Sequence, residues 1–525
     1  MLLHDGWPQY LLLRCIILIL QFLGPACVAY TAYSISEAWP EWRVPSVFQA
    51  WCALESAFFL FFFLFYRRYL QREATHPPPR TKKQRRALFA KVRLEVHDPD
   101  KFFSGWFRGA KAEDIGREDV RVFLNWAFWD GQADMYGADQ KELDEYIGKV
   151  EEMLRTPFKP GRGSAKSLRL TLDPIEMECR TLAWYGLIML ADTVTHFVMK
   201  KNGFQYFKTR ASSTAVYPLR PAAMVEHANS PAKGMSYWVR PHTSKIQLPI
   251  LYVHGIGIGL ISSTRLLHEL DQALNAHGNE KSDGEVGILA IEILQVSSRL
   301  TTPMLRREEF LQQLTQILDV NGYKRFVLAS HSYGSVPSTH ILTNDKLAKR
   351  VASTLFIDPV TVLLHMPDVA YNFTVRQPKT TAEWQLWYFA SKDPGIAHTL
   401  GRHFFWSENV LWRDRIMELV GKGMKMTASL ASKDLIVDTQ AVGMYLTENI
   451  VPDPVLKEDE DGRKQMELQV GKEAYGTAHQ WKHRPWRGNG LEVIWWEGLD
   501  HAQVYDQAST RARLIEVLVE YSRDR

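Results

Sequence analysis

The chain begins with two long apolar stretches separated by a short polar one. Residues 10–33 carry a single charged residue, Arg14, and residues 47–66 carry only Glu55. About 20 mostly apolar residues suffice for a helix to cross the hydrocarbon core of a bilayer. The pattern therefore predicts two transmembrane helices, 10–33 and 47–66, within a membrane anchor covering residues 1–75.

Two other interpretations of this anchor stay open. The first stretch could be a cleaved signal peptide, although its apolar part is longer than usual and contains Arg14. Glu55 leaves room for a single span, with the other stretch lying in the membrane interface.

Positive charge is concentrated directly after the second stretch. Residues 67–86 hold eight Lys and Arg against one acid, whereas the connector 34–45 holds two acids and one Arg. Basic residues favour the cytosolic side of a membrane. We therefore expect an integral membrane protein whose remaining chain lies in the cytosol, with an endomembrane favoured. The segment 76–86 is expected to be a stiff proline spacer followed by a basic patch that can bind anionic lipid headgroups.

Residues 76–240 are predicted to form this basic juxtamembrane segment and a mainly helical extension. Helical patterns occur at 118–130 and 140–155. The run 182–199 is mostly apolar but contains Asp192 and His196, which suits a buried or interfacial helix better than a third span. We interpret His196 as a core residue rather than a metal ligand.

From residue 241 the pattern changes to short apolar runs that alternate with helical ones. Strand-like runs begin the segments 248–260, 285–294, 325–330, 351–360, 425–437 and 490–501. This alternation predicts an α/β domain over 241–525, with a mostly parallel central sheet and helices on both faces. Ligands and reactive groups in such sheets lie at the carboxyl ends of the strands.

Composition removes several function classes. The formal charge is only +4 over 525 residues, so nothing in the total favours nucleic acid. Four cysteines, three of them in the apolar N-terminal stretches, offer neither a disulfide framework nor zinc spacing. We expect no metal and no cofactor.

One strand-like run leads directly into a serine-rich turn. Residues 328–336 read LASHSYGSV, and Ser332 stands at the end of the apolar run with small residues on both sides. A strand, a sharp turn and a helix form the context of a nucleophile elbow. A serine hydroxyl needs a base to remove its proton, so the chain must also supply a histidine and a group that orients it.

Both partners are available at later strand ends. His501 follows the last apolar run and Asp434 follows the one before it. In this arrangement His501 would take the Ser332 proton, while Asp434 would fix the imidazole tautomer. Asp358 also ends a strand and is the alternative acid; Asp438, or no acid, remains a further option.

The developing oxyanion needs backbone donors. One is expected to be the N–H of Tyr333, which directly follows the serine. The other is expected from the glycine-rich loop HGIGIG after the first strand of this region, with Ile256 preferred and Gly257 as the alternative.

Four motifs in this order resemble the α/β-hydrolase superfamily, in its lipase and esterase group. They are His254–Gly257, Ser330–Gly334, Ser432–Val437 and Asp500–Ala502. The common elbow begins with Gly, where this chain has Ser330. In the resembled fold a helical lid is inserted between two adjacent strands, which corresponds here to residues 361–424. Its aromatic residues are expected either to line an acyl pocket or to form the lid's own core.

The resemblance implies a membrane-anchored serine hydrolase that cleaves esters of lipids or other hydrophobic acyl compounds through an acyl-enzyme on Ser332. The bilayer and a hydrophobic ester are then the expected partners. The alternative is a catalytically inactive scaffold of the same fold. Epoxide hydrolases and dehalogenases are less fitting because they carry Asp at the elbow. The long interval between Asp434 and His501 contains a charged segment, 457–469, which we interpret as a solvated insertion.

Overall fold

The computed structural model describes residues 6–38, 46–275, 284–447, 455–458, 464–467 and 480–523. Its centre is an eight-stranded sheet in the order β1-β2-β4-β3-β5-β6-β7-β10. The strands are β1 (Gln205–Phe207), β2 (Ser236–Arg240), β3 (Ile250–Val253), β4 (Ile288–Glu292), β5 (Phe326–His331), β6 (Val351–Ile357), β7 (Lys425–Ala431) and β10 (Leu491–Trp496). From β4 to β10 all neighbours are parallel, whereas β2 is antiparallel to both β1 and β4.

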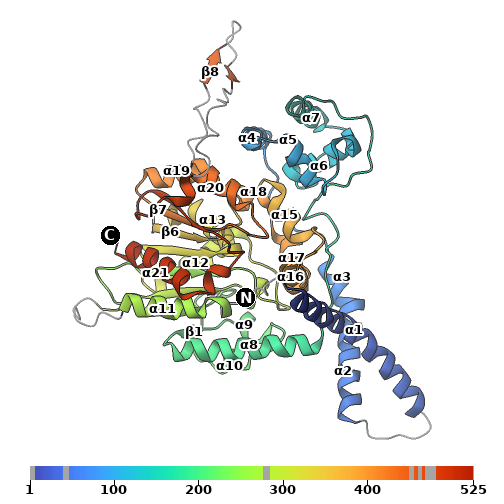
Figure 1. Cartoon of the computed structure of the whole chain (residues 1–525), viewed down its shortest axis with the longest axis vertical. Coiled ribbons are helices and arrows are strands. Elements are labelled where there is room, and N and C mark those ends of the chain that lie inside the picture. The colour runs from blue at the N-terminus through green and yellow to red at the C-terminus, as the bar shows by residue number, and fades with distance from the viewer. Residues whose placement is uncertain are drawn as a thin grey trace.

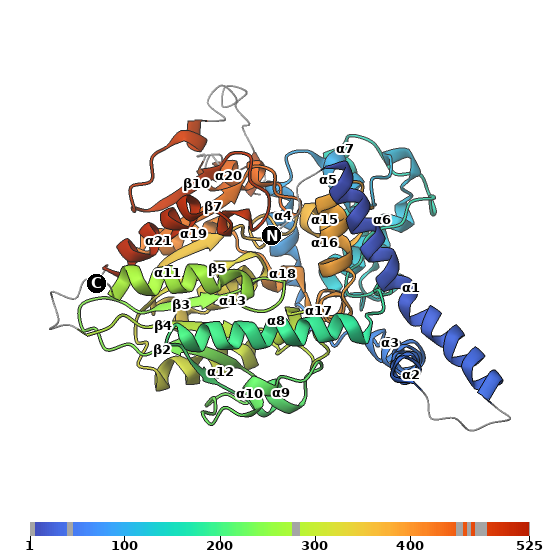
Figure 2. The same cartoon turned by 60° about the horizontal axis from the view of Figure 1, so that its bottom comes forward.

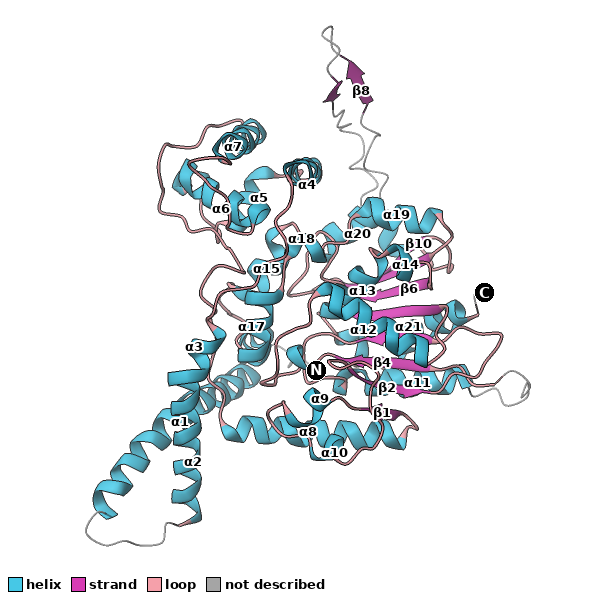
Figure 3. Cartoon of the chain, turned by 180° about the vertical axis from the view of Figure 1, so that it is seen from behind, coloured by secondary structure: helices cyan, strands magenta, loops and turns pink. Residues whose placement is uncertain are grey.

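Helices cover both faces of this sheet (Figure 3). One face carries α11 (Thr264–Asn275) and α21 (Ala508–Ser522), and the other carries α12 (Arg307–Val320), α13 (Ser335–Leu342) and α20 (Thr439–Thr447). Successive residues of β3 serve opposite cores: Leu251 and Val253 pack on one side, Ile250 and Tyr252 on the other. Strands buried on both faces are continuously apolar, which made them visible in the sequence. The expected parallel sheet is confirmed.

The boundary expected between residues 240 and 241 cuts through this sheet. β1 and β2 lie before it in the chain, yet β2 pairs with β4 from Ser236 to Arg240. β1 has only three residues and β2 only five, so neither stands out in a segment that is otherwise helical. The sheet therefore takes in part of the segment expected to be a helical extension.

The rest of that segment is helical. It contains α4 (Lys82–Glu95), α5 (Pro99–Trp106), α6 (Arg117–Trp129), α7 (Gln140–Leu154), α8 (Leu182–Lys201), α9 (Arg210–Thr214) and α10 (Pro221–Met224). Helices α4 to α7 form a unit beside the sheet domain (Figure 1), built on aromatic contacts such as Phe89 on Tyr146, with ring centroids 4.1 Å apart.

Two apolar helices form an antiparallel pair at the N-terminus. α1 (Trp7–Ala38) packs against α2 (Val47–Phe61), which continues through a π-helical turn (Phe62–Tyr66) into α3 (Arg67–Leu70). Among the described residues three helices are long and apolar enough to cross a membrane: Trp7–Ser36, Val47–Leu70 and Leu182–Lys201. The two expected apolar helices are thus present. Most of the expected connector, residues 39–45, lies outside the described residues.

Two insertions interrupt the later strands. Between β6 and β7 lie α15 (Pro367–Thr374), α16 (Thr381–Leu386), a π-helical turn (Trp387–Ser391), α17 (Pro394–His403), α18 (Trp406–Asn409) and α19 (Arg413–Gly421). Between α20 and β10, strands β8 (Val455–Glu458) and β9 (Lys464–Glu467) form a separate two-stranded sheet. Figures 1 and 3 both show this hairpin standing away from the domain. The remainder of the expected insertion 457–469 lies outside the described residues.

Candidate active site

Ser332 lies at a sharp turn between β5 and α13. Its backbone has φ +52°, a left-handed conformation that a residue with a Cβ adopts only at a cost. A single short helical turn, Ser332–Gly334, leads from the strand into the helix. Space is tight here, since a Cβ on Gly334 would stand 2.3 Å from the carbonyl oxygen of Val253. The local structure is the strand–turn–helix that the sequence predicted.

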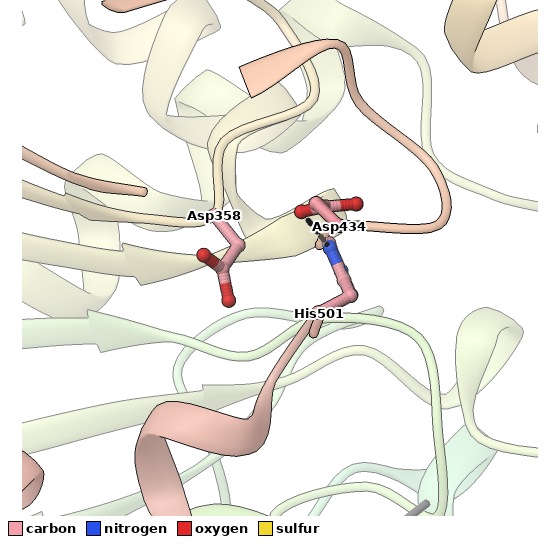
Figure 4. A group of neighbouring side chains, drawn as sticks. All are labelled: Asp358, Asp434 and His501. Atoms are coloured by element: carbon pink, nitrogen blue, oxygen red, sulfur yellow. Dashed lines mark hydrogen bonds and ion pairs between the residues drawn. The ribbon is translucent and has the colours of Figure 1, made fainter. Parts of the chain in front are cut away.

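The structure brings the serine, the histidine and one of the acids together. His501 Nε2 is 2.8 Å from Ser332 Oγ, and its Nδ1 is 2.7 Å from Asp434 Oδ2. The Asp434 side chain is inaccessible to solvent and that of His501 is 10% exposed. Figure 4 shows the carboxylate of Asp434 pointing at the imidazole ring. Asp434 is therefore the acid whose carboxylate contacts the imidazole of His501.

Backbone N–H groups fix both loops. Asp434 Oδ1 accepts from the N–H groups of Ile436 and Val437, at 2.8 and 2.9 Å. The neighbouring Asp500 accepts from the N–H of His501 at 2.6 Å and from that of Leu435 at 2.9 Å, so it links the two loops. Asp500 lies in one of the four sequence motifs, but the sequence predicted no role of its own for it.

Asp358, the alternative acid, has a different contact. Its Oδ2 accepts from the N–H of Ala502 at 2.9 Å, and Figure 4 shows it beside His501 with no bond drawn to the ring. Both Asp358 (φ +46°) and Ala502 (φ +65°) have left-handed backbones. Asp358 thus anchors the turn that carries the histidine. Asp438, the other alternative, pairs with Lys101 at 3.3 Å.

The acids around His501 set its charge. Burial of the imidazole opposes its protonation, but the charge of Asp434 and the hydrogen bond to it outweigh burial, with Asp358 and Asp500 contributing, and raise the pKa of His501 to about 9. Burial raises the pKa of the Asp358 carboxyl above its usual range. The imidazole is therefore held in its charged form near neutral pH.

The glycine-rich loop after β3 runs alongside the serine. A Cβ on Gly255 would stand 2.7 Å from Ser332 Cβ, so only glycine allows this approach. The N–H of Gly257 donates to Val296 O at 3.1 Å, which removes this group as an oxyanion donor. Apart from bonds internal to a helix or strand, the N–H groups of Ile256 and Tyr333 have no backbone acceptor in the described part of the chain. The N–H groups of Ile256 and Tyr333 therefore remain the candidate oxyanion donors.

The other histidines here support the backbone. His254 Nδ1 is 2.7 Å from Gly255 O, and its Nε2 accepts from the N–H of Ile293 at 2.9 Å. His331 is buried, with its ring centroid 5.0 Å from that of Tyr505. Burial, together with the nearby His501, lowers the pKa of His331, which keeps it neutral. Away from the site, His196 is a paired core residue, 2.9 Å from Glu226 Oε1.

Most aromatic side chains of the 361–424 insertion face other helices. Trp384 and Tyr388 pack against α1, and Phe389 lies 5.1 Å from Trp184 of α8 between ring centroids. Trp406 lines an apolar cavity among α4 to α7 and donates to the carbonyl of Ala127. Phe404, in contrast, lies beside the elbow, 6.1 Å from the Tyr333 ring.

The fold is recognised from the strands that the serine, the acid and the histidine each follow. The serine follows β5, the acid follows β7 and the histidine follows β10, in the observed strand order, and an insertion of helices separates β6 from β7. The chain has the α/β-hydrolase fold. Its additions are the N-terminal apolar helices and the α4–α7 unit.

No family model and no curated protein sequence matches the chain. Among solved structures it is similar to a membrane phospholipase A described as a bacterial virulence factor, with 11% identity over 65% of this chain and 94% of the other, and a TM-score of 0.35. It is also similar to the carboxylesterase CesB of Bacillus subtilis (10% identity, 63% and 98% covered, TM-score 0.32) and an esterase of Rhodococcus (12%, 55% and 96%, 0.34). Likenesses this remote do not bear on the reaction, which has to be inferred from the site.

Proposed function

We propose that this protein is a membrane-anchored serine hydrolase that cleaves carboxylic esters through an acyl-enzyme on Ser332. The observation that carries the proposal is the chain of two hydrogen bonds, 2.8 Å from Ser332 to His501 and 2.7 Å from His501 to Asp434, at a left-handed turn. A serine next to a base that is itself oriented by a carboxylate is the arrangement of an activated nucleophile.

The first half of the reaction forms the acyl-enzyme. Ser332 Oγ attacks the ester carbonyl carbon while His501 Nε2 takes its proton, and the carbonyl electrons move onto oxygen. The N–H groups of Ile256 and Tyr333 donate to this oxyanion. When the intermediate collapses, the C–O bond to the alcohol breaks and His501 returns the proton to the departing oxygen. Asp434 stabilises the imidazolium in between.

Water completes the cycle. It attacks the acyl carbon while His501 takes one of its protons, and the second intermediate releases the acid as the proton returns to Ser332 Oγ. The site uses only its own side chains and backbone for these steps.

We propose a hydrophobic ester, such as a membrane lipid, as the substrate. Two features support this choice: α1 and α2 belong to segments long and apolar enough to cross a membrane, and an aromatic side chain, Phe404, lies beside Tyr333 at the elbow. The basic residues after the second helix favour a cytosolic domain. Protease added to sealed microsomes should then digest the domain, and its protection would reverse this orientation.

The test of the reaction is covalent labelling. A fluorophosphonate probe should label the wild-type chain at Ser332 and leave Ser332→Ala unlabelled, and Ser332→Ala should hydrolyse no short-chain ester. Ser335→Ala is the matched control and should still be labelled. Ser335 donates to the carbonyl of Ser332 and is fully buried in α13, so its own hydroxyl is not open to the probe. Labelling that survives in Ser332→Ala would contradict the proposal, and a wild type that takes no label would favour the inactive scaffold.

A further inference from the structure

One side of α8 exposes large apolar side chains. Leu187, Leu190, Val194 and Phe197 are 58, 60, 50 and 64% exposed. Steps of three and four residues place them in one stripe along the helix, which we call the α8 stripe. The acidic residue of the helix, Asp192, is buried instead. This is the reverse of a water-facing surface helix.

The polar side of α8 is bound to the domain by buried ion pairs. Asp192 Oδ2 accepts from Arg220 Nε at 3.0 Å and its Oδ1 accepts from Arg299 Nη2 at 2.6 Å. Arg220 also donates to both carboxylate oxygens of Glu292 on β4, at 2.8 and 2.6 Å. His196, on the same side, is paired with Glu226.

These pairs prevent α8 from leaving the domain as a third span. Inserting the helix across a bilayer would carry Asp192 into hydrocarbon and leave Arg220 and Arg299 without it. An unpaired charge costs several kcal/mol both in the hydrocarbon of a bilayer and in the protein interior. α8 also contacts β1 and α11, so it is packed onto the sheet domain.

The first turn of α8 is joined to the membrane anchor. Both carboxylate oxygens of Glu55, on α2, accept from the N–H of Leu182, at 3.1 and 2.9 Å. Phe58 of α2 packs on Tyr185, with ring centroids 5.7 Å apart. In Figure 1 α8 lies along the edge of the domain from which the hairpin projects, and in Figure 2 it crosses the view while α2 is seen nearly end-on.

The apolar surface continues beyond the stripe. Leu219, Met224 and Val225, in and beside α10, are 51, 45 and 72% exposed, and α10 contacts α8. Two lysines end the helix: Lys200, which pairs with Glu226 at 3.0 Å, and the exposed Lys201. An apolar stripe with cations at its end matches a bilayer surface, where acyl chains meet phosphate headgroups.

We infer that α8 is an in-plane membrane helix whose outward stripe is embedded in the same bilayer that the hairpin enters. A free amphipathic helix turns its own polar side to water. In α8 that side is covered by the domain instead. The domain is therefore seated on the membrane along its α8 edge rather than tethered at a distance from it. This inference does not depend on the reaction at Ser332.

Spin labels on the full chain in phosphatidylcholine vesicles test the inference. The native cysteines are replaced, and a nitroxide is attached in turn at Leu187→Cys, Leu190→Cys, Val194→Cys and Phe197→Cys. Accessibility to oxygen and to a nickel chelate gives the depth of each label. Val320→Cys is the control, because Val320 is equally apolar and 69% exposed but lies on α12.

An in-plane helix requires one shallow depth at all four positions, with high oxygen and low nickel accessibility, while Val320→Cys reports water. A spanning helix would give depths that change by up to about 15 Å between residues 187 and 197. Water-like values along the stripe would mean a free surface, and low accessibility to both reagents would mean a protein partner. Each of these three results overturns the inference.

A second measurement leaves the native cysteines in place. Benzoylphenylalanine at position 197 is a conservative replacement for an exposed Phe, and illumination should add the mass of a phospholipid to the chain. A cross-link to protein, or no adduct, contradicts the inference.

Discussion

At the scale of single residues, the site has left-handed backbones at the ends of two neighbouring strands, β5 and β6, and very close packing at the serine turn. Ser332 and Asp358 each have a positive φ, and such residues cost of order 1–3 kcal/mol each. Gly255 and Gly334 allow the β3 loop to pass directly beside the turn. The strained serine is thus held by neighbours that leave it no room to relax.

Gly255→Ala tests this packing. The new Cβ would overlap Ser332 Cβ, which is 2.7 Å away, and a displacement of about 1 Å should lower kcat by about 100-fold. Ester hydrolysis by the folded variant is the measurement. Gly148→Ala on α7, where a Cβ meets nothing within 4 Å, should keep full activity. Unchanged activity in Gly255→Ala would show that the loop is free to move.

The pH profile tests the base. The reaction needs neutral His501, and its pKa is raised to about 9, so the rate should rise with pH through the neutral range. We expect kcat/KM, measured from pH 6 to 10, to have its rising midpoint above the ordinary histidine value of about 6.5. A profile of kcat/KM that is already flat at pH 6.5 would contradict the raised pKa of His501.

The two acids should differ when each is replaced. Asp434→Asn removes the charge that orients and stabilises the imidazole, and kcat should fall by about 10⁴. Asp358→Asn keeps an oxygen for the N–H of Ala502 and should cost much less than Asp358→Ala, which releases the histidine turn. Equal losses in Asp434→Asn and Asp358→Asn would mean that both acids serve the imidazole.

At the scale of elements, the sequence predicted the strands that are buried on both faces and alternate with helices. β3, β5 and β7 are such strands, and the residues at their ends followed because parallel strands end at one edge. β1 and β2 were missed because each begins with a polar residue and lies in a segment that is otherwise mainly helical. The contact of Asp358 with Ala502 joins residues 144 apart in the chain, and no local pattern announces such a bond.

The β8–β9 hairpin should be dispensable. Its strands pair only with each other among the described strands, and it stands away from the domain. Replacing residues 455–467 by a short Gly-Ser linker should leave ester hydrolysis intact and change the free energy of unfolding by less than about 1 kcal/mol, the size of a loop-length effect. Loss of activity with the fold retained would instead give the hairpin a part in substrate binding.

At the scale of the whole molecule, stability should depend on the buried pairs that hold α8. Asp192→Ala leaves Arg220 and Arg299 short of a partner inside the protein, and this should cost about 3–5 kcal/mol. Asp319→Ala is the control: its pair with Arg350 is largely exposed on the Asp side, and losing it should cost at most about 1 kcal/mol. Chemical unfolding of both variants in the same detergent measures the difference.

The bond between Glu55 and the first turn of α8 also bears on the order in which the chain folds during synthesis. A ribosome makes the chain from its N-terminus, so Glu55 is made 127 residues before Leu182. The acceptor for the start of α8 then already exists in α2, whereas Arg220 and Arg299, which pair with Asp192 of α8, have still to be made. We expect the nascent α8 to be captured beside α2 first and closed onto the sheet afterwards, which makes the anchor a template for the domain that follows it.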